Sequence, residues 1–115
     1  MIIRSFSITP AQAGAAAAAI YTVPAGFIGT LKQLVATNTT GTARTITVYL
    51  VPSGGSPSAT NTVISAMTIP PSGIGQISLA HLISNQVMAA GGTLQVLASA
   101  ATAISFTGGG IEEVA

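Results

Sequence analysis

Charge is nearly absent from the middle of this chain, and that absence constrains its surface more than any other feature. The charged side chains are Arg4, Lys32, Arg44, Glu112 and Glu113, so the long stretch between Arg44 and Glu112 carries none. A typical soluble domain has about a quarter of its residues charged, whereas here the fraction is 4% and the mean hydropathy is +0.70. We therefore expect much of the exterior to be covered by another molecule.

Lipid is not expected to be that molecule. A membrane-spanning helix needs about 20 consecutive apolar residues, but Ser, Thr, Asn, Gln, Gly and Pro interrupt every apolar run here well before that length. A secretory signal is not expected either, because Arg4 follows the first apolar residues while Ser5 and Ser7 interrupt the run after it. The sequence predicts no membrane partner and favours a covering made of protein.

Length and composition narrow the class of protein further. We expect residues 1–115 to form one domain, large enough to bury a core without help from a metal or a disulfide. Cysteine is absent, which excludes a disulfide framework and a thiolate zinc site within the chain. A net charge of +1 provides no cluster of Lys and Arg to neutralise phosphates. Neither nucleic acid nor a cofactor is an expected partner.

Short alternating segments separated by turn residues predict an all-β fold. The clearest alternation is at residues 44–51, where Ile46, Val48 and Leu50 face one side. Both faces of residues 27–37 are apolar, as in a strand buried on two sides. Further strands are expected at residues 2–9, 62–69, 75–79, 93–98, 103–107 and 111–114. About seven or eight short strands predict an antiparallel β-sandwich or a jelly-roll-like fold.

The Ala-rich residues 9–20 fit two structures equally well. Thr9 suits a helix cap, Pro10 suits the first helical position, and Gln12 stands three residues beyond the cap. Alanine also has a high helix propensity. Gly14 interrupts this pattern, however, and an extended arm lying against a neighbouring subunit would use the small alanine side chains as well. A short N-terminal helix and an extended arm therefore both remain open.

Residues with catalytic or metal-binding chemistry are few. Asp and Cys are absent and His81 is the only imidazole, so one chain does not supply a Ser-His-Asp or Cys-His arrangement. His81 lies in residues 80–90, which predict a short helical turn or a kinked strand, and its metal partners would have to come from another subunit. Adjacent Glu112 and Glu113 would point to opposite faces of a strand and are interpreted as a solvated C-terminal end. We expect no enzyme, and no catalytic, cofactor-binding or metal-binding residues.

The remaining motifs favour structural roles. Residues 54–55 and 108–110 are glycine runs without the Lys-Ser/Thr of a phosphate loop, and are interpreted as turns, bulges or hinges. Asn38 begins a glycosylation acceptor pattern but is interpreted as part of a polar loop. Tyr21 and Tyr49 are expected to be partly buried strand aromatics rather than a sugar-stacking platform.

Three turn signatures lie next to the expected strands, one before residues 27–37 and one after each of 27–37 and 44–51. They read Ile-Tyr-Thr-Val-Pro-Ala-Gly at residues 20–26, Ala-Thr-Asn-Thr-Thr-Gly at 36–41 and Val-Tyr-Leu-Val-Pro-Ser-Gly-Gly at 48–55. A proline-glycine turn at 69–73 and Gly-Gly-Thr-Leu at 91–94 continue the pattern, the latter lacking the acid usual at its second position. This pattern resembles small virion structural proteins of tailed bacteriophages. The resemblance implies a compact β-sandwich attached to the head or the tail of a phage particle.

A virion structural role is therefore the expected function. Uncharged Thr, Ser and Ala faces would pack against neighbouring subunits or a shell, and multivalent attachment would stabilise weak contacts. The first hypothesis is a capsid decoration or cement protein, a homotrimer that contacts the major capsid protein in a virion assembled in the bacterial cytoplasm. A tail, collar or baseplate accessory protein is the rival in the same class. A receptor- or carbohydrate-binding module, with residues 38–42 and 52–61 holding the ligand, is the alternative from another class.

Overall fold

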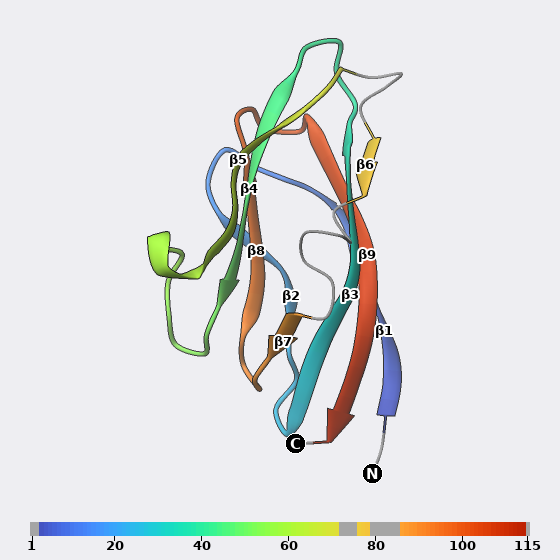
Figure 1. Ribbon diagram of the computed structural model, residues 1–115, viewed down its shortest axis with the longest axis vertical. Helices are drawn as coiled ribbons and strands as arrows, with labels where there is room; N and C mark the ends of the chain where they lie inside the picture. The colour runs from blue at the N-terminus through green and yellow to red at the C-terminus, as the bar shows by residue number, and fades with distance from the viewer. Residues whose placement is uncertain (1–2, 72–75, 79–85, 115) are drawn as a thin grey trace.

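Two antiparallel β-sheets face each other in this protein (Figure 1). The structure is a computed structural model that describes residues 3–71, 76–78 and 86–114. The strands in these described residues are β1 (Ile3–Gln12), β2 (Ala18–Thr22), β3 (Phe27–Asn38), β4 (Arg44–Val51), β5 (Thr62–Ile69), β6 (Gln76–Ser78), β7 (Gln86–Met88), β8 (Thr93–Ala98) and β9 (Ile104–Val114). One turn of 3-10 helix, η1 (Ala59–Asn61), precedes β5. No helix in the described part of the chain has the length and apolar character needed to cross a membrane.

The strand pairs are nested along the chain. β1 pairs with β9, β2 with β8, β3 with β6 and β7, and β4 with β5. The first sheet has the order β1-β9-β3 with β6 and β7 both on β3, and the second has the order β2-β8-β4-β5. Nested pairs that alternate between two sheets make a jelly roll. The all-β sandwich expected from the sequence is confirmed.

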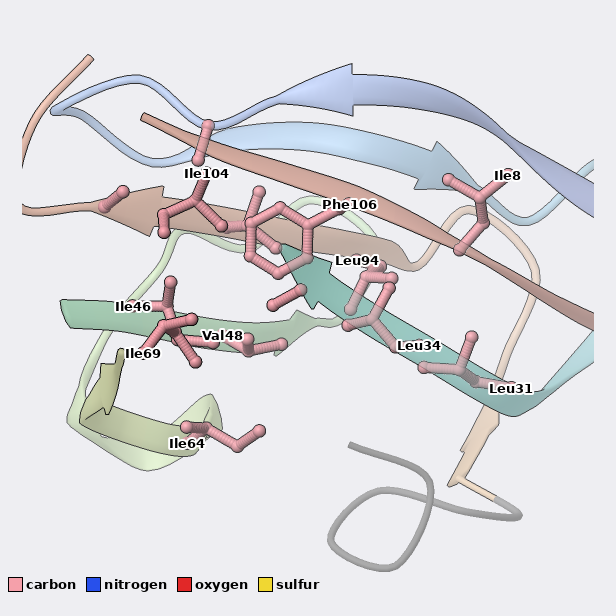
Figure 2. Packing of buried hydrophobic residues seen from close by; sticks show 14 of the residues in the cluster. Ile8, Leu31, Leu34, Ile46, Val48, Ile64, Ile69, Leu94, Ile104 and Phe106 are labelled. Carbon is pink, nitrogen blue, oxygen red and sulfur yellow. The ribbon is translucent and has the colours of Figure 1, made fainter. Parts of the chain in front are cut away.

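The hydrophobic core fills the space between the two sheets (Figure 2). In the second sheet the sequence alternation sets the burial directly. Ile46 and Val48 of β4 lie opposite Ala98 and Val96 of β8, and all four are at most 1% exposed. The largest fully buried side chains come from both sheets: Phe106, Ile8, Leu31, Leu34, Ile46, Ile69, Leu94, Ile104, Val23 and Val48.

Strand β3 corrects the prediction of a strand buried on both faces. Lys32 is an extra residue, because Leu31 and Gln33 pair with consecutive residues of β9. Such a β-bulge shifts the alternation of side chains by one position. Leu31 and Leu34 consequently both point into the core, each at 0% exposure. The apolar residues that the sequence assigns to two faces therefore belong to one core face. Some lie before the bulge and the others lie after it.

The glycines at residues 108–110 lie inside β9 rather than in a turn or hinge, and the two strands expected on either side of them are one. A Cβ atom on Gly108 or Gly110 would overlap a backbone carbonyl oxygen of β3, and one on Gly109 would overlap a carbonyl oxygen of β1. The missing side chains therefore let both neighbouring strands approach β9 closely. A bulge was one of the roles expected for these glycines. The structure has a bulge in β3, opposite them.

Residues 9–20 form no helix. Gln12 completes β1 and Ala18 begins β2, so both ends of this segment are extended. Pro10, which lacks the N–H donor, lies at a break in the register between β1 and β9, where an edge strand tolerates it. Between the strands, Ala13 is 2% exposed in the core. Ala13 alone anchors the segment in the core, while the other residues of the segment are exposed or half-buried. Contact with a neighbouring subunit stays a prediction.

Two further predictions concern segments that the structure describes only in part. Residues 76–78 form β6 within the strand expected at 75–79. Residues 86–88 form β7, an extended end to the segment for which a helical turn or a kinked strand was expected. His81 lies outside the described residues, so its position and role stay untested.

Candidate functional site

β1 starts and β9 finishes at the same end of the sandwich (Figure 1). Polar and aromatic side chains from these two strands, β2 and β3 contact one another near that end. Glu112 on β9 is 4% exposed, and its carboxylate accepts a hydrogen bond from Nε of Arg4 on β1 at 2.7 Å. The carboxylate also accepts a hydrogen bond from the hydroxyl of Tyr21 on β2. We call Arg4, Phe6, Tyr21, Phe27 and Glu112 the end cluster.

Aromatic contacts complete the end cluster. The rings of Phe6 and Tyr21 are stacked, with centroids 4.1 Å apart and planes 5° from parallel. The guanidinium of Arg4 lies 4.1 Å from the centroid of the Phe27 ring, within the range of a cation–π interaction. A Cβ atom at Gly29 would come within 3.2 Å of the Tyr21 hydroxyl, so glycine at this position leaves room for the phenol. The cluster thus joins three strands of one sheet to β2 of the other.

The electrostatics of the cluster keep Glu112 ionised. The hydrogen bond from Tyr21 lowers the pKa of Glu112, and so do the hydrogen bond and the positive charge of Arg4. Burial acts in the opposite direction but is outweighed. Burial of Tyr21 raises its pKa well above the ordinary value. The hydrogen bond to Glu112 and the negative charge of Glu112 act in the same direction. Neither group is poised to exchange a proton near neutral pH. The arrangement is therefore suited to holding strands together rather than to acid–base chemistry.

This geometry corrects the interpretation of Glu112 and Glu113 as a solvated end. The two side chains do point to opposite faces of a strand, as expected, but Glu112 faces inward and is paired. Sequence reasoning missed this contact because Arg4 and Glu112 are separated by 108 positions. The available signal was that both lie in the first and last expected strands, which a sandwich can bring together.

The outer faces of the sheets carry little charge. Arg4 and Glu112 are tied to each other in the end cluster, which leaves Lys32, Arg44 and Glu113 as the other charged residues of the chain. Large exposed apolar side chains lie on both sheets: Ile3 at 57%, Val87 at 65% and Val114 at 43% on the first, and Val63 at 37% on the second. The exterior therefore carries little charge, because Glu112 is buried and the 51% exposed side chain of Arg4 is paired with it.

The two loops assigned to a ligand in the carbohydrate-binding alternative do not meet. Residues 38–42 precede the start of β4 and residues 52–61 follow its end (Figure 1). A strand of this length separates them by about 23 Å at about 3.3 Å per residue. They do not form the single site that this alternative requires.

Asn38, the last residue of β3, binds both the loop that follows it and the end of β5. It is 1% exposed, and its side-chain amide donates hydrogen bonds to the carbonyl oxygens of Thr42 at 2.8 Å and Ile69 at 3.2 Å. Its side-chain oxygen accepts hydrogen bonds from the backbone and the hydroxyl of Thr40. The acceptor pattern that begins at Asn38 thus builds a turn between the two sheets, and its amide is buried in this fold.

Tyr21 and Tyr49 are both half-buried strand aromatics, as expected. Within the described ranges, no three His, Cys, Asp or Glu side chains gather closely enough to hold a metal ion.

Comparisons with known proteins give a fold-level likeness at most. No protein-family model matches the sequence, and no curated protein matches it. Among solved structures, that of the infectious bursal disease virus Gt strain aligns with a TM-score of 0.45 and 13% identity, over 96% of this chain and 31% of that one. The Gx strain gives 0.45 and 14% over 97% and 33%, and the VP2 subviral particle of the same virus gives 0.42 and 15% over 96% and 32%. The chain thus spans about a third of the length of these structures, and overlap at this level assigns no function. These matches do not test the resemblance to tailed-phage proteins, which stays a prediction.

Proposed function

We propose that this chain is a virion structural protein, a decoration or cement protein that binds the assembled head of a phage. The observation that carries the proposal is the charge-poor exterior. Only 4% of the residues are charged, and two of them, Arg4 and Glu112, are paired with each other. Apolar side chains are exposed on both sheets. Such a surface favours association when it is free in solution, and an assembly covers it.

The fold and the turn signatures agree with this proposal. Jelly rolls occur in viral capsid domains, but also in lectins and cupins, so the fold supports the proposal by analogy alone. The signatures at residues 20–26, 36–41 and 48–55 carry the resemblance to tailed-phage virion proteins. Each spans the end of a strand and the start of the following connection. They are therefore features of the backbone path and not of a catalytic site.

The proposed partners are other copies of the chain and the major capsid protein, in a virion assembled in the bacterial cytoplasm. A homotrimer is the oligomer proposed from the sequence, and no enzymatic activity is proposed. A tail, collar or baseplate accessory protein is the second candidate, because the same charge-poor exterior would suit a tail assembly. The carbohydrate-binding module is less well supported, since residues 38–42 and 52–61 lie at opposite ends of β4.

Two measurements test the proposal. Analytical ultracentrifugation over a wide concentration range is expected to show self-association, and co-sedimentation with undecorated shells of the phage that carries the gene is expected to bring the protein down with them. Tail assemblies are the matched comparison, because binding to tails and not to shells would favour the second candidate. An electron-microscopy map of the intact particle would then locate the copies. A stable lone subunit that binds neither shells nor tails would overturn the proposal.

A further inference from the structure

The edges of the two sheets differ in how well they are protected against pairing with another strand. An edge strand presents unpaired N–H and C=O groups, and natural proteins blunt such edges with short strands, bulges, prolines or charges. The first sheet is bounded by β1 on one side and by β6 and β7 on the other, and the second by β2 and β5.

Three of the edges formed by the described strands are blunted. β6 and β7 have three residues each. β2 has five residues, and its register with β8 breaks between Ala19 and Tyr21. β5 is bulged against β4, with Ala66 at a φ of 49°, a left-handed conformation that twists the strand. None of these strands offers a long regular ladder to a partner.

The first half of β1 is the exception. β1 has ten residues, and its register with β9 is unbroken from Ile3 to Ile8. The bulge and Pro10 blunt the strand only beyond that point. Ser5 and Ser7 are exposed, and Ile3 is 57% exposed. A regular segment of six residues, about 20 Å long, therefore has one edge that no described strand pairs.

The one charge on this segment is held in the end cluster, where the side chain of Arg4 is 51% exposed and Glu112 is buried. Arg4 is the one charged residue of β1, and its Nε is bonded to Glu112 in the end cluster while its guanidinium lies over Phe27. A lysine-like charge free to project along the edge would repel an approaching strand. The outward face of this segment instead presents Ile3, Ser5 and Ser7.

We infer that the first half of β1 pairs with the same segment of a second copy, so that the first sheet continues from one copy into the next about a two-fold axis. Antiparallel pairing of identical segments is self-complementary, because each copy offers the same donors and acceptors to the other. Small uncharged Ser5 and Ser7 would lie opposite each other without steric conflict. Net charge of +1 per chain adds little repulsion between copies.

This inference rests on the proposed structural role, because the contact is small. About five paired residues per copy bury much less than the roughly 1,200 Å² of a stable independent interface, so a single contact is weak. In a shell with many copies, weak contacts add up. The contact is pairwise, so it would join two trimers into a hexamer or two single chains into a dimer.

Charged substitutions on β1 test the inference directly. In the double variant Ser5→Lys, Ser7→Lys, like charges would face each other across the axis, and we expect the dissociation constant from sedimentation equilibrium to rise at least about tenfold. The matched control Ser65→Lys, Thr68→Lys adds the same charge at exposed positions of the bulged edge strand β5 and is expected to leave association unchanged. Mixing the Lys variant with Ser5→Glu, Ser7→Glu is expected to restore the pairs.

The absence of cysteine allows a second, covalent readout. Single variants Ser5→Cys and Ser7→Cys, oxidised alone and as a mixture, are expected to give disulfide-linked pairs in at least one combination, since these positions lie near the proposed axis. Ser65→Cys is the control and is expected to stay unlinked. Oxidation at high protein concentration keeps the weak contact populated during the reaction.

The outcomes separate this inference from the proposed function. If the wild type associates and binds shells but the Lys variant does so with the same affinity, the β1 contact is wrong and the structural role stands. If the Lys and Glu variants both dissociate but do not recombine, β1 pairs with a different segment or a different protein, and the inference is again wrong. If the wild type neither associates nor binds particles, both fail.

Discussion

The centres of the two sheets follow different rules. In β8 every second residue is buried, and in β4 the alternation of the sequence holds for Ile46 and Val48, before half-buried Leu50 and buried Val51 end it. In β3 and β9 the alternation is broken by the extra residue Lys32 on one strand and by three glycines on the other. The difference shows that side-chain periodicity predicts burial only where the register between strands is regular.

The glycines of β9 and the bulge of β3 belong together. A bulge inserts one residue into a strand and increases its local twist. The backbone of β3 then approaches β9 so closely that a Cβ atom on Gly110 would overlap the carbonyl oxygen of Thr30. The centre of the first sheet therefore depends on glycines, which have no side chain. The centre of the second sheet depends on branched side chains that pack against one another.

Substituting a central glycine tests this dependence and has the largest expected effect. Gly110→Ala is expected to lower the free energy of unfolding by more than about 3 kcal/mol, because backbone atoms would have to move to relieve the overlap. Gly41→Ala is the control: a Cβ atom there meets nothing within 4 Å, and its effect is expected within about 0.5 kcal/mol. Urea unfolding of both variants measures the difference. Equal effects would mean that the two strands are not as close as the structure has them.

Truncating neighbouring residues after the bulge sharpens the comparison. Leu34 is 0% exposed in the core and Val35 points to the outer face, half-buried. Leu34→Ala is expected to cost about 3 kcal/mol, within the range for buried leucines. Val35→Ala is expected to cost less than about 1 kcal/mol, as for partly exposed positions. A strand buried on both faces would instead give two large losses, and chemical denaturation distinguishes the two results.

Acid sensitivity tests the end cluster and has the smallest expected effect. Because contacts in the fold lower the pKa of Glu112, the unfolded chain binds its proton more tightly. Glu112 therefore contributes stability above its unfolded pKa of about 4.3, and that contribution is lost as the pH falls through the lower folded value. Glu112→Gln is expected to cost about 2 kcal/mol at neutral pH and to flatten the loss of stability below about pH 4.

Two further variants control that prediction. Glu113→Gln removes a neighbouring carboxylate but keeps the end cluster, and is expected to keep the acid-dependent loss. Tyr21→Phe removes the hydrogen bond that contributes most to lowering the pKa of Glu112, so the acid-dependent loss is expected to be smaller and to be complete at a higher pH. Thermal unfolding at a series of pH values measures all three. An unchanged pH profile in Glu112→Gln would show that the cluster does not govern acid stability.

Much of the fold could be predicted from the sequence where neighbouring residues carry the signal. The alternation of Ile46, Val48 and Leu50 and the turn residues between segments were enough to predict an all-β sandwich. Thr9, Pro10 and Gln12 gave a local helix signal that was wrong. Edge-strand pairing with β9 overrides this propensity, and an edge position accepts the proline. Local propensity is a weak predictor wherever a long-range partner is present.

The candidate site was much less predictable. Glu112 was interpreted as solvated because nothing near it in the sequence could pair with it. Its partners Arg4 and Tyr21 lie 108 and 91 positions away and come from different strands. The unprotected edge of β1 was equally invisible, since an edge is defined only by which strands lack a neighbour.

The sequence by itself determined that this protein is a sheet-rich chain with too little charge for an ordinary exposed surface, because composition and periodicity are properties of the residues alone. Only the tertiary structure decided which of those few charges are hidden, which glycines must have no side chain and which strand is left open at the edge. These depend on contacts between distant strands, and the register of a sheet is fixed by packing across both layers rather than by any one segment.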